Sequence, residues 1–514
     1  MKQPPQTILV LDFGSQYTQL IARRIREAHV YSEIVDSAIS VEAIRKHNPA
    51  GLILSGGPAS VHQPGAPSVD PRIFELGLPI LGICYGLQLM AKLLGGEVKR
   101  AGSREYGAAT LTADTANPLF AGIPAESGVW MSHADEVVKL PRGFQPIAES
   151  GRVPNTAVWN GKKRFWGVQF HPEVVHTKHG KRMLRNFVRG ICGCQAKWTP
   201  RAYVAQAVET IRNQVGDAQV VCGLSGGVDS AVAALLIHKA IGDRLTCIFV
   251  DNGLLRWREA DKLMEVFAKK LRVRVKKVDA ADHFLDCLAG VTEPERKRKV
   301  IGHEFITVFK QAAKGIPNAH YLAQGTLYPD VIESSGIGKH AEVIKSHHNV
   351  GGLPKELGFK LVEPLRMLFK DEVRALGKEL GMDEEMIWRQ PFPGPGLAVR
   401  CLGEITRAKL DILREADRIV GEEIKKAGWY RRVWQSFAVL LPIQSVGVQG
   451  DGRSYDFTCV IRAVHSSDGM TADWVPLPHA LLARISTRIT NEVKGINRVA
   501  YDITSKPPST IEWE

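Results

Sequence analysis

The stretch Cys-Gly-Leu-Ser-Gly-Gly-Val-Asp-Ser at residues 222–230 decides the fold of the middle of the chain. Apolar runs at 218–221 and 231–237 flank it, a pattern that predicts a buried strand, a glycine turn and a helix. Gly226 and Gly227 let the backbone turn sharply and bring N–H groups close to a ligand. Because two serine hydroxyls and a helix N-terminus lie beside them, the loop is predicted to bind a polyphosphate.

This loop is not a Walker A loop, because no Gly-Lys pair of the chain is followed by Ser or Thr, and we expect no lysine in the cradle. The alternative is an ordinary strand-to-helix turn, but two serines, two glycines and an aspartate at one helix start argue against it. The Ser-Gly-Gly-Val-Asp-Ser sequence resembles the PP-loop of ATP pyrophosphatases, which cleave ATP between its α- and β-phosphates. The resemblance implies that ATP is bound by Ser225, Gly226, Gly227, Val228, Asp229, Ser230 and Ala231.

Composition bounds the class of protein. A chain of 514 residues is predicted to form two to four domains, and 44% apolar with 24% charged residues is typical of a soluble globular protein. The apolar runs are about as long as strands, well below the ~20 residues of a membrane span, and the run 8–11 is predicted to be a first strand, not a signal peptide. Eight cysteines without a C-x-x-C pair indicate reduced thiols and a cytoplasmic location, with no zinc signature.

The net charge of +13 has three explanations: nucleic acid binding, anionic small-molecule substrates, or solvated surface. The alternating basic run 272–277 is typical of an amphipathic strand, which favours the surface explanation for part of the charge. We therefore expect no nucleic acid partner.

The N-terminal third alternates short buried strands (8–11, 52–54 and 79–83) with helices, which predicts a parallel α/β sheet. The third strand runs into Gly-Ile-Cys-Tyr-Gly at 82–86, which has the form of a nucleophile elbow. A helix N-terminus at Cys84 would favour its thiolate. The alternative is a buried structural cysteine, but the flanking glycines favour a nucleophile.

A thiolate needs a base. A strand at 165–170 leads into His171-Pro172-Glu173, so His171 can exchange a proton with Cys84 and Glu173 can orient the imidazole. His133 is the competing base; we rank it lower and expect it near the pocket.

These residues resemble class I glutamine amidotransferases over about the first 190 residues, with landmarks at 55–58, 82–86 and 170–173. The resemblance implies that Cys84 attacks the glutamine side-chain amide and releases glutamate and ammonia. It also implies an oxyanion hole of the Gly57 and Tyr85 N–H groups. Further glutamine contacts are expected from Gln88, Ser132 and His133.

The next strand of the middle third, 245–250, ends in Asp251. Ligands of a doubly wound sheet lie at the carboxyl ends of the strands, so Asp251 is placed to contact a nucleotide. The PP-loop resemblance assigns this neighbourhood to adenine and ribose, which adds Val250. A carboxylate beside a triphosphate needs a cation between them, so Asp229 is predicted to bind Mg²⁺.

Four cations at 296–299 precede a predicted helix, 300–309, where acidic residues would be favoured, so an anion is expected there. The long stretch 327–352 shows no strong periodicity and is predicted to be a lid. The PP-loop, the segments 325–334 and 345–354 and the amidotransferase together resemble the glutamine-hydrolysing GMP synthase family along the whole chain. The resemblance implies amination of XMP to GMP through an adenylyl-XMP intermediate. The reaction would consume glutamine and ATP, would require Mg²⁺, and would release AMP, pyrophosphate and glutamate.

The proline-rich stretch 390–396 cannot be helical and is predicted to end the ATP domain. Beyond it, a helix (405–426), strands (436–441, 455–463 and 499–503) and a helix (481–493) predict a small α+β unit, which the family resemblance makes a homodimerisation domain. By the same resemblance the tail folds over XMP, with Lys506 at the 5′-phosphate. The other XMP contacts implied are Arg298, Arg453, Arg498, Ile511 and Glu512.

The predicted plan is an α/β multidomain protein: an amidotransferase at 1–195, a doubly wound PP-loop domain at 199–389 and the dimerisation and XMP domain at 390–514. Two rivals remain at this point, a tRNA-thiolating PP-loop enzyme and a nucleotide sensor with an inactive glutaminase. The first would not need the Phe-His-Pro-Glu motif, and the intact Cys84, His171 and Glu173 argue against the second.

Overall fold

The computed structural model describes residues 6–151, 153–334, 358–449, 452–466 and 471–514. Its contacts divide the chain into two compact units, residues 1–203 with 327–344 and residues 204–326 with 345–514. The three predicted domain ranges remain predictions.

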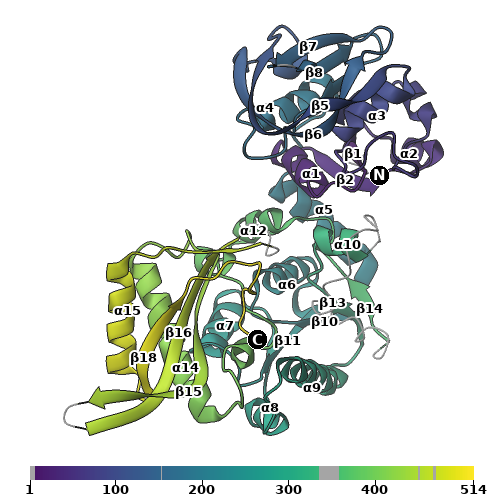
Figure 1. The fold of residues 1–514 in the computed structure, drawn as a ribbon. Helices are drawn as coiled ribbons and strands as arrows, with labels where there is room; N and C mark the ends of the chain where they lie inside the picture. The colour runs from purple at the N-terminus through teal and green to yellow at the C-terminus, as the bar shows by residue number, and fades with distance from the viewer. Residues whose placement is uncertain (1–5, 152, 335–357, 450–451, 467–470) are drawn as a thin grey trace. The chain divides into compact units, whose positions relative to one another are not determined.

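The first unit is built on a nine-stranded sheet in the order β2-β1-β3-β4-β9-β8-β7-β5-β6 (Figure 1). Five strands run parallel and bury most of their residues, as strands covered on both faces do. They are β1 (Thr7–Asp12), β2 (Tyr31–Asp36), β3 (Gly51–Leu54), β4 (Ile80–Ile83) and β9 (Phe165–Val168). The predicted parallel α/β sheet is confirmed.

Antiparallel strands extend this sheet on one side: β5 (Glu97–Ala113), β6 (Glu126–Lys139), β7 (Gln145–Ser150) and β8 (Val153–Asn160). The α-helices described in the unit are α1 (Thr18–Glu27), α2 (Val41–His47), α3 (Tyr85–Leu93), α4 (Gly180–Arg185) and α10 (Tyr328–Ser334).

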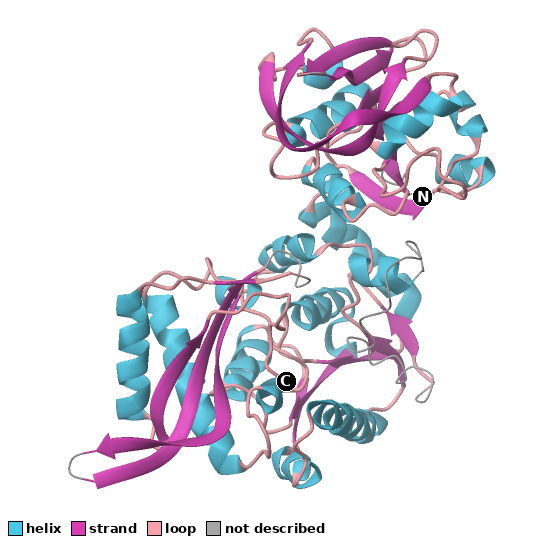
Figure 2. Ribbon diagram, viewed as in Figure 1, coloured by secondary structure: helices cyan, strands magenta, loops and turns pink. Residues whose placement is uncertain are grey.

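The second unit contains a five-stranded parallel sheet in the order β12-β11-β10-β13-β14, flanked by helices (Figure 2). The strands are β10 (Gln219–Gly223), β11 (Leu245–Asp251), β12 (Val275–Asp279), β13 (Ala319–Ala323) and β14 (Lys360–Val362). The strand order reverses at β10, which confirms the predicted doubly wound sheet and puts a ligand crevice at the carboxyl end of β10. The helices are α5 (Pro200–Val215), α6 (Val228–Ile241), α7 (Glu259–Met264), α8 (Ala281–Leu288), α9 (Pro294–Lys314), α12 (Lys370–Glu379) and α13 (Glu384–Ile387).

The C-terminal part packs α14 (Arg407–Lys426) and α15 (His479–Glu492) against a sheet of β15 (Gln435–Gln449), β16 (Gly452–His465), β17 (Asp473–Trp474) and β18 (Ile496–Asp502). β15 and β16 are longer than predicted, because antiparallel pairing continues to Gln449 and Gly452 beyond the last buried apolar residues. The resulting hairpin extends past the two helices (Figure 1).

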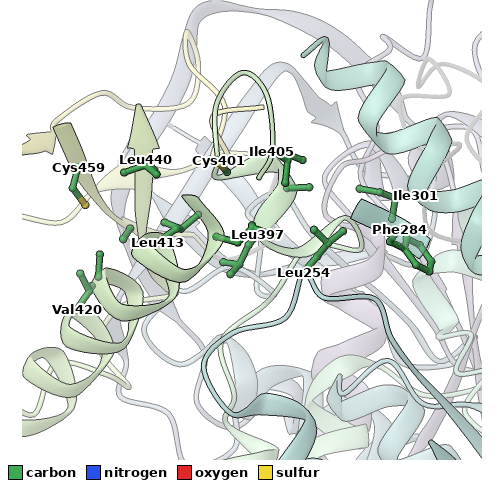
Figure 3. Close-up of a cluster of buried hydrophobic side chains, with 14 of the residues drawn as sticks. Leu254, Phe284, Ile301, Leu397, Cys401, Ile405, Leu413, Val420, Leu440 and Cys459 are labelled. Carbon is green, nitrogen blue, oxygen red and sulfur yellow. The ribbon is translucent and has the colours of Figure 1, made fainter. Parts of the chain in front are cut away.

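One buried cluster contains residues from the parallel-sheet part and from the C-terminal part of the second unit (Figure 3). Leu254 and Leu397 illustrate the connection, since the Leu397 N–H donates to the Leu254 carbonyl at 2.8 Å. A Cβ at Gly396 would lie 2.4 Å from that same carbonyl, and Gly396 has a φ of +65°, so only glycine fits.

Two local expectations differ from the structure. Residues 328–334, predicted to be irregular, form α10 (Tyr328–Ser334), while the rest of the predicted lid to residue 352 lies outside the described residues. The cations at 296–299 lie inside α9, whose N-terminus is capped by the Glu293 side chain.

No helix among the described residues has the length and apolar character needed to cross a bilayer. All eight cysteines are free thiols, which agrees with the predicted reduced state.

Candidate active sites

Cys84 occupies a strained turn between β4 and α3. Its φ of +51° and ψ of −106° are unusual for a residue with a side chain. A Cβ at Gly86 would lie 2.3 Å from the Leu54 carbonyl oxygen, and one at Gly82 would lie 2.7 Å from the Leu87 nitrogen. Both glycines are therefore required for the chain to turn here, as the elbow interpretation predicts.

The predicted catalytic residues meet at the Cys84 sulfur. His171 hydrogen-bonds to Cys84 and, through Nδ1, to Oε1 of Glu173 at 2.7 Å. The sulfur lies 3.6 Å from the Ser132 carbonyl oxygen. Gln169 donates from Nε2 to the sulfur at 3.8 Å. This residue was not predicted from the sequence, although it directly precedes the Phe-His-Pro-Glu motif.

The electrostatics of the site favour a protonated His171. Burial lowers the pKa of the imidazole, but the hydrogen bonds and negative charges of Cys84 and Glu173 outweigh burial and raise the pKa to about 10. The His171 carbonyl accepts a hydrogen bond from the Thr177 hydroxyl at 2.6 Å. The Tyr17 ring packs edge-on against the His171 imidazole, with 5.3 Å between the ring centroids. The imidazole is thus held in one orientation.

The remaining predicted glutaminase residues surround this centre. His133 is buried, and burial lowers the pKa of its imidazole, so its neutral form is favoured beside the cationic His171. Gln88 donates from Nε2 to the Asp135 carbonyl at 2.8 Å. A Cβ at Gly57 would lie 3.3 Å from Cγ of Tyr85, so the two residues predicted to form the oxyanion hole are neighbours.

The predicted phosphate loop of the second unit lies between β10 and α6. Gly226 has a φ of +73°, a conformation that glycine adopts readily. The loop is tied by the Ser230 hydroxyl, which accepts from the Ser225 N–H at 3.3 Å and lies 3.0 Å from the Ser225 hydroxyl. Gly325, just after β13, packs on the helix start, since a Cβ there would lie 3.3 Å from the Ser230 nitrogen.

A lysine reaches this loop from a distant part of the chain. Lys370, the first residue of α12, donates from Nζ to both carboxylate oxygens of Asp229, at 2.7 and 2.6 Å. The expectation of a cradle without lysine is therefore wrong for the folded site, although it holds for the loop sequence. Arg389 also contacts the loop, donating from Nη1 to the Gly226 carbonyl at 2.6 Å, and pairs with Glu259.

Val250 and Asp251 end β11, which pairs in parallel with β10, so both residues lie at the same sheet edge as the loop. Val250 is buried, and Asp251 pairs with Lys277 at 3.1 Å.

The C-terminal tail is anchored by buried cations. Arg400 is fully buried and donates from Nε and Nη2 to the two carboxylate oxygens of Glu512, at 2.9 and 2.8 Å. Lys297, also fully buried, pairs with the Glu514 side chain and donates to the Cys401 carbonyl at 3.0 Å. Arg462 donates to the Thr504 and Thr510 carbonyls. The tail is thus an ordered part of the second unit.

Four of the predicted XMP residues lie on or against this tail. Arg298 donates from Nη2 to the Glu514 carbonyl at 2.5 Å, Ile511 is buried, and the Lys506 backbone pairs with Ala472. Glu512, predicted to lie near the purine, accepts hydrogen bonds from Arg400. A cavity of about 760 Å³ beside the tail is lined by residues including Tyr501, Thr504, Glu512 and Trp513.

Arg453 and Arg498 lie on strands β16 and β18 and not on the C-terminal tail. Arg453 opposes Val448 on the extended hairpin, near the start of β16, whereas the Lys506–Ala472 bridge adjoins the last residues of that strand. Arg498, near the start of β18, donates to the Ser445 hydroxyl at 3.3 Å. The structure does not bring these two arginines together with Arg298 and Lys506.

Three family models match successive parts of the chain: "Glutamine amidotransferase class-I" at residues 9–191, "NAD synthase" at 202–300 and "GMP synthase C terminal domain" at 422–513. With the geometry above, they define a class I glutamine amidotransferase joined to a PP-loop, ATP-using enzyme.

Full-length relatives narrow the class. A glutamine-hydrolysing GMP synthase from Heliobacterium modesticaldum is 56% identical over 515 residues, covering 100% of both chains. Those of Staphylococcus carnosus (57% identical, 100% of both chains) and Caldanaerobacter subterraneus subsp. tengcongensis (58%, 99% of both chains) are similar. The chain belongs to the glutamine-hydrolysing GMP synthases, which are ATP-dependent ligases.

Solved structures resemble a part of the chain. A GMP synthase subunit from Thermoplasma acidophilum is 32% identical, covers 37% of this chain and 96% of its own, and has a TM-score of 0.34. A glutamine amidotransferase from Thermotoga maritima is 20% identical, covers 37% of this chain and 99% of its own, and has a TM-score of 0.30.

The Glu173–His171 hydrogen bond generates a prediction about pH. Because Glu173 raises the pKa of His171, Glu173→Gln should lower that pKa, so the imidazolium is lost at lower pH. We expect glutamine hydrolysis to fall on the order of 10²-fold or more, and the alkaline limb of its kcat/KM profile to move down from near pH 10. An unchanged alkaline limb would contradict this role, and ammonia-dependent turnover serves as the internal control.

The Lys370–Asp229 pair generates a second prediction. Lys370→Met and Asp229→Asn should each lower ammonia-dependent ATP consumption, by about 10²-fold, the size expected when a charge that stabilises a reacting phosphate is removed. The double variant should lose less than the product of the two, because the groups act through one contact. Lys378→Met, an exposed lysine of the same helix, is the control. Independent, multiplicative losses would count against a shared role.

Proposed function

We propose that this chain aminates XMP to GMP with nitrogen taken from glutamine, at two reaction centres on one polypeptide. The observation that supports this most directly is the pairing of a Cys84–His171–Glu173 centre with a glycine-rich loop at the switch point of a doubly wound sheet. The relatives' name, which describes a glutamine-hydrolysing GMP synthase, supports the same reaction.

At the first centre, the Cys84 sulfur attacks the amide carbon of glutamine. His171 holds the thiol proton and delivers it to the departing ammonia, while Glu173 keeps the imidazole oriented. Water then cleaves the thioester to glutamate and regenerates the thiol. The N–H groups of Gly57 and Tyr85 would stabilise the oxyanion, and Gln88, Ser132 and His133 would hold the glutamine.

At the second centre, residues 225–231 bind the phosphates of ATP, while Val250 and Asp251 contact adenine and ribose. The C2 oxygen of XMP is a poor leaving group; when it attacks the α-phosphorus of ATP, pyrophosphate leaves and adenylyl-XMP forms. Ammonia then displaces AMP at C2, which gives GMP. No side chain has to form a covalent bond to a substrate in these two steps at the second centre.

Asp229 fits a site for Mg²⁺ that arrives with ATP. Its carboxylate already holds one cation, the Lys370 ammonium, beside two serine hydroxyls, and carboxylate oxygens together with phosphates are the usual ligands of Mg²⁺. Bound there, Mg²⁺ would neutralise the departing pyrophosphate. Lys370 would then be free to turn toward the phosphates.

We assign the XMP phosphate to Lys506 and Arg298, and the purine to the neighbourhood of Ile511 and Glu512. Arg453 and Arg498 remain candidates for binding an anion, on strands β16 and β18 and not beside Lys506 and Arg298. In this assignment Arg400 fixes the position of Glu512, because a carboxylate bonded twice by a buried guanidinium cannot turn away.

The protein is further proposed to act as a cytoplasmic homodimer through its C-terminal part. Val446 and Tyr455 oppose each other on the extended hairpin, and both are exposed, by 54% and 60%, as is Val448 by 77%. An apolar strand face of this kind is a hazard when left in water, and a second copy would cover it.

Activity assays test the proposed reaction. Cys84→Ala should abolish GMP formation from XMP with glutamine but leave it with ammonium, because only the first centre needs the thiol. AMP and pyrophosphate should appear in equal amounts with GMP. Loss of the ammonium-dependent reaction in this variant would contradict the division of labour, and a failure of the wild-type protein to aminate XMP would reject the function.

The homodimer is tested by sedimentation. Val446→Asp should convert a wild-type dimer to monomer, because a buried unpaired carboxylate is strongly unfavourable at an apolar interface. Val175→Asp, at a valine exposed by 76% in the first unit, is the matched control and should leave the mass unchanged. A wild-type monomer, or a Val446→Asp variant that stays dimeric, would exclude this interface.

A further inference from the structure

Helices α8 and α9 bring together three chemically different donor side chains, none of which is assigned to either proposed reaction centre. His283 and Cys287 are four residues apart on α8 and therefore share one face of that helix. Glu304 comes from α9, and its Oε2 lies 2.7 Å from Nε2 of His283. One ligand atom of each residue, nitrogen, sulfur and oxygen, lies within 4.8 Å of the other two.

The buried core packs α8 against α9, so the three side chains lie close together without any movement of the backbone. Phe284 and Leu288 of α8 and Ile301 and Val308 of α9 all belong to the same buried cluster. Figure 3 shows Phe284 next to Ile301 at this contact. His283 and Cys287 lie on the outer side of α8, where His283 is exposed and Cys287 is half-buried.

We propose that His283, Cys287 and Glu304 bind a Zn²⁺ ion, with water as the fourth ligand. Zinc accepts nitrogen, sulfur and oxygen in tetrahedral geometry, whereas Mg²⁺ and Ca²⁺ take oxygen only. Ligand atoms of a tetrahedral zinc site lie about 3.5 Å apart, given the usual bond lengths, so small side-chain rotations close the site. The alternative is a simple ion pair between His283 and Glu304, but such a pair would not account for the Cys287 sulfur beside it.

Such an ion would clamp α8 to α9. The clamp matters because α9 also carries Lys297 and Arg298, which hold the C-terminal tail through Glu514. The ion would therefore stabilise the helix on which the tail is anchored, without touching substrate.

Metal titration of the full-length protein tests this site. The experiment uses Cys84→Ala protein stripped of metal, because Cys84 and His171 could otherwise bind the same ion. We expect one equivalent of Co²⁺ to produce thiolate-to-cobalt charge-transfer absorption, and one equivalent of Zn²⁺ to abolish it and to raise the thermal unfolding temperature.

Cys287→Ser should remove the charge-transfer absorption, and His283→Ala or Glu304→Gln should weaken Zn²⁺ binding by at least about tenfold, the smallest loss seen when even an outer partner of a metal ligand is removed. His320→Ala, at an exposed histidine of β13, is the matched control and should bind as the parent does. Circular dichroism of the metal-free variants checks that each is folded. Undiminished Zn²⁺ binding in Cys287→Ser, a cobalt spectrum without sulfur absorption, or no binding at all would each overturn the proposal.

Discussion

Close approach of backbone to backbone at strand-to-helix turns is the constraint on which both proposed centres depend. At the first, the absence of a side chain at Gly86 lets the chain pass the Leu54 carbonyl, and this places Cys84 at the tip of the turn. At the second, Gly325 lets the end of β13 pack against the start of α6, beside the phosphate loop. Parallel strands end at one sheet edge, so each turn presents its polar groups where other strands also end.

Charge is handled differently in the two units. In the first, Glu173, His171 and Cys84 form one buried row of hydrogen-bonded side chains, and the charges of Cys84 and Glu173 keep a proton on the imidazole. In the second, three fully buried cations, Lys297, Arg400 and Arg462, contact the C-terminal tail and backbone carbonyls. Because a buried charge without a partner is costly, these contacts hold the tail in one position beside the residues assigned to XMP.

The sequence predicted most of this, for identifiable reasons. Glycines that flank a nucleophile or a phosphate loop leave a local pattern, so the sequence alone could name Cys84, His171, Glu173 and the loop 225–231 as candidates. Lys370 could not, because it lies 141 residues from Asp229 and nothing near it in sequence marks it as a phosphate-site residue. The His283–Cys287–Glu304 cluster was missed for the same reason, since its third member comes from another helix. The lengths of β15 and β16 were underestimated because backbone pairing, rather than an apolar pattern, continues these strands to Gln449 and Gly452.

Joining an ammonia-producing centre to an ATP-cleaving centre makes sense only if the oxygen that ammonia replaces leaves on AMP. The most direct measurement is therefore to supply XMP labelled with oxygen-18 at C2 and to follow the label by mass spectrometry. The account predicts that the label appears in the phosphate of AMP, one atom for each GMP formed. Label recovered in water or in orthophosphate, with ADP as the spent nucleotide, would contradict it.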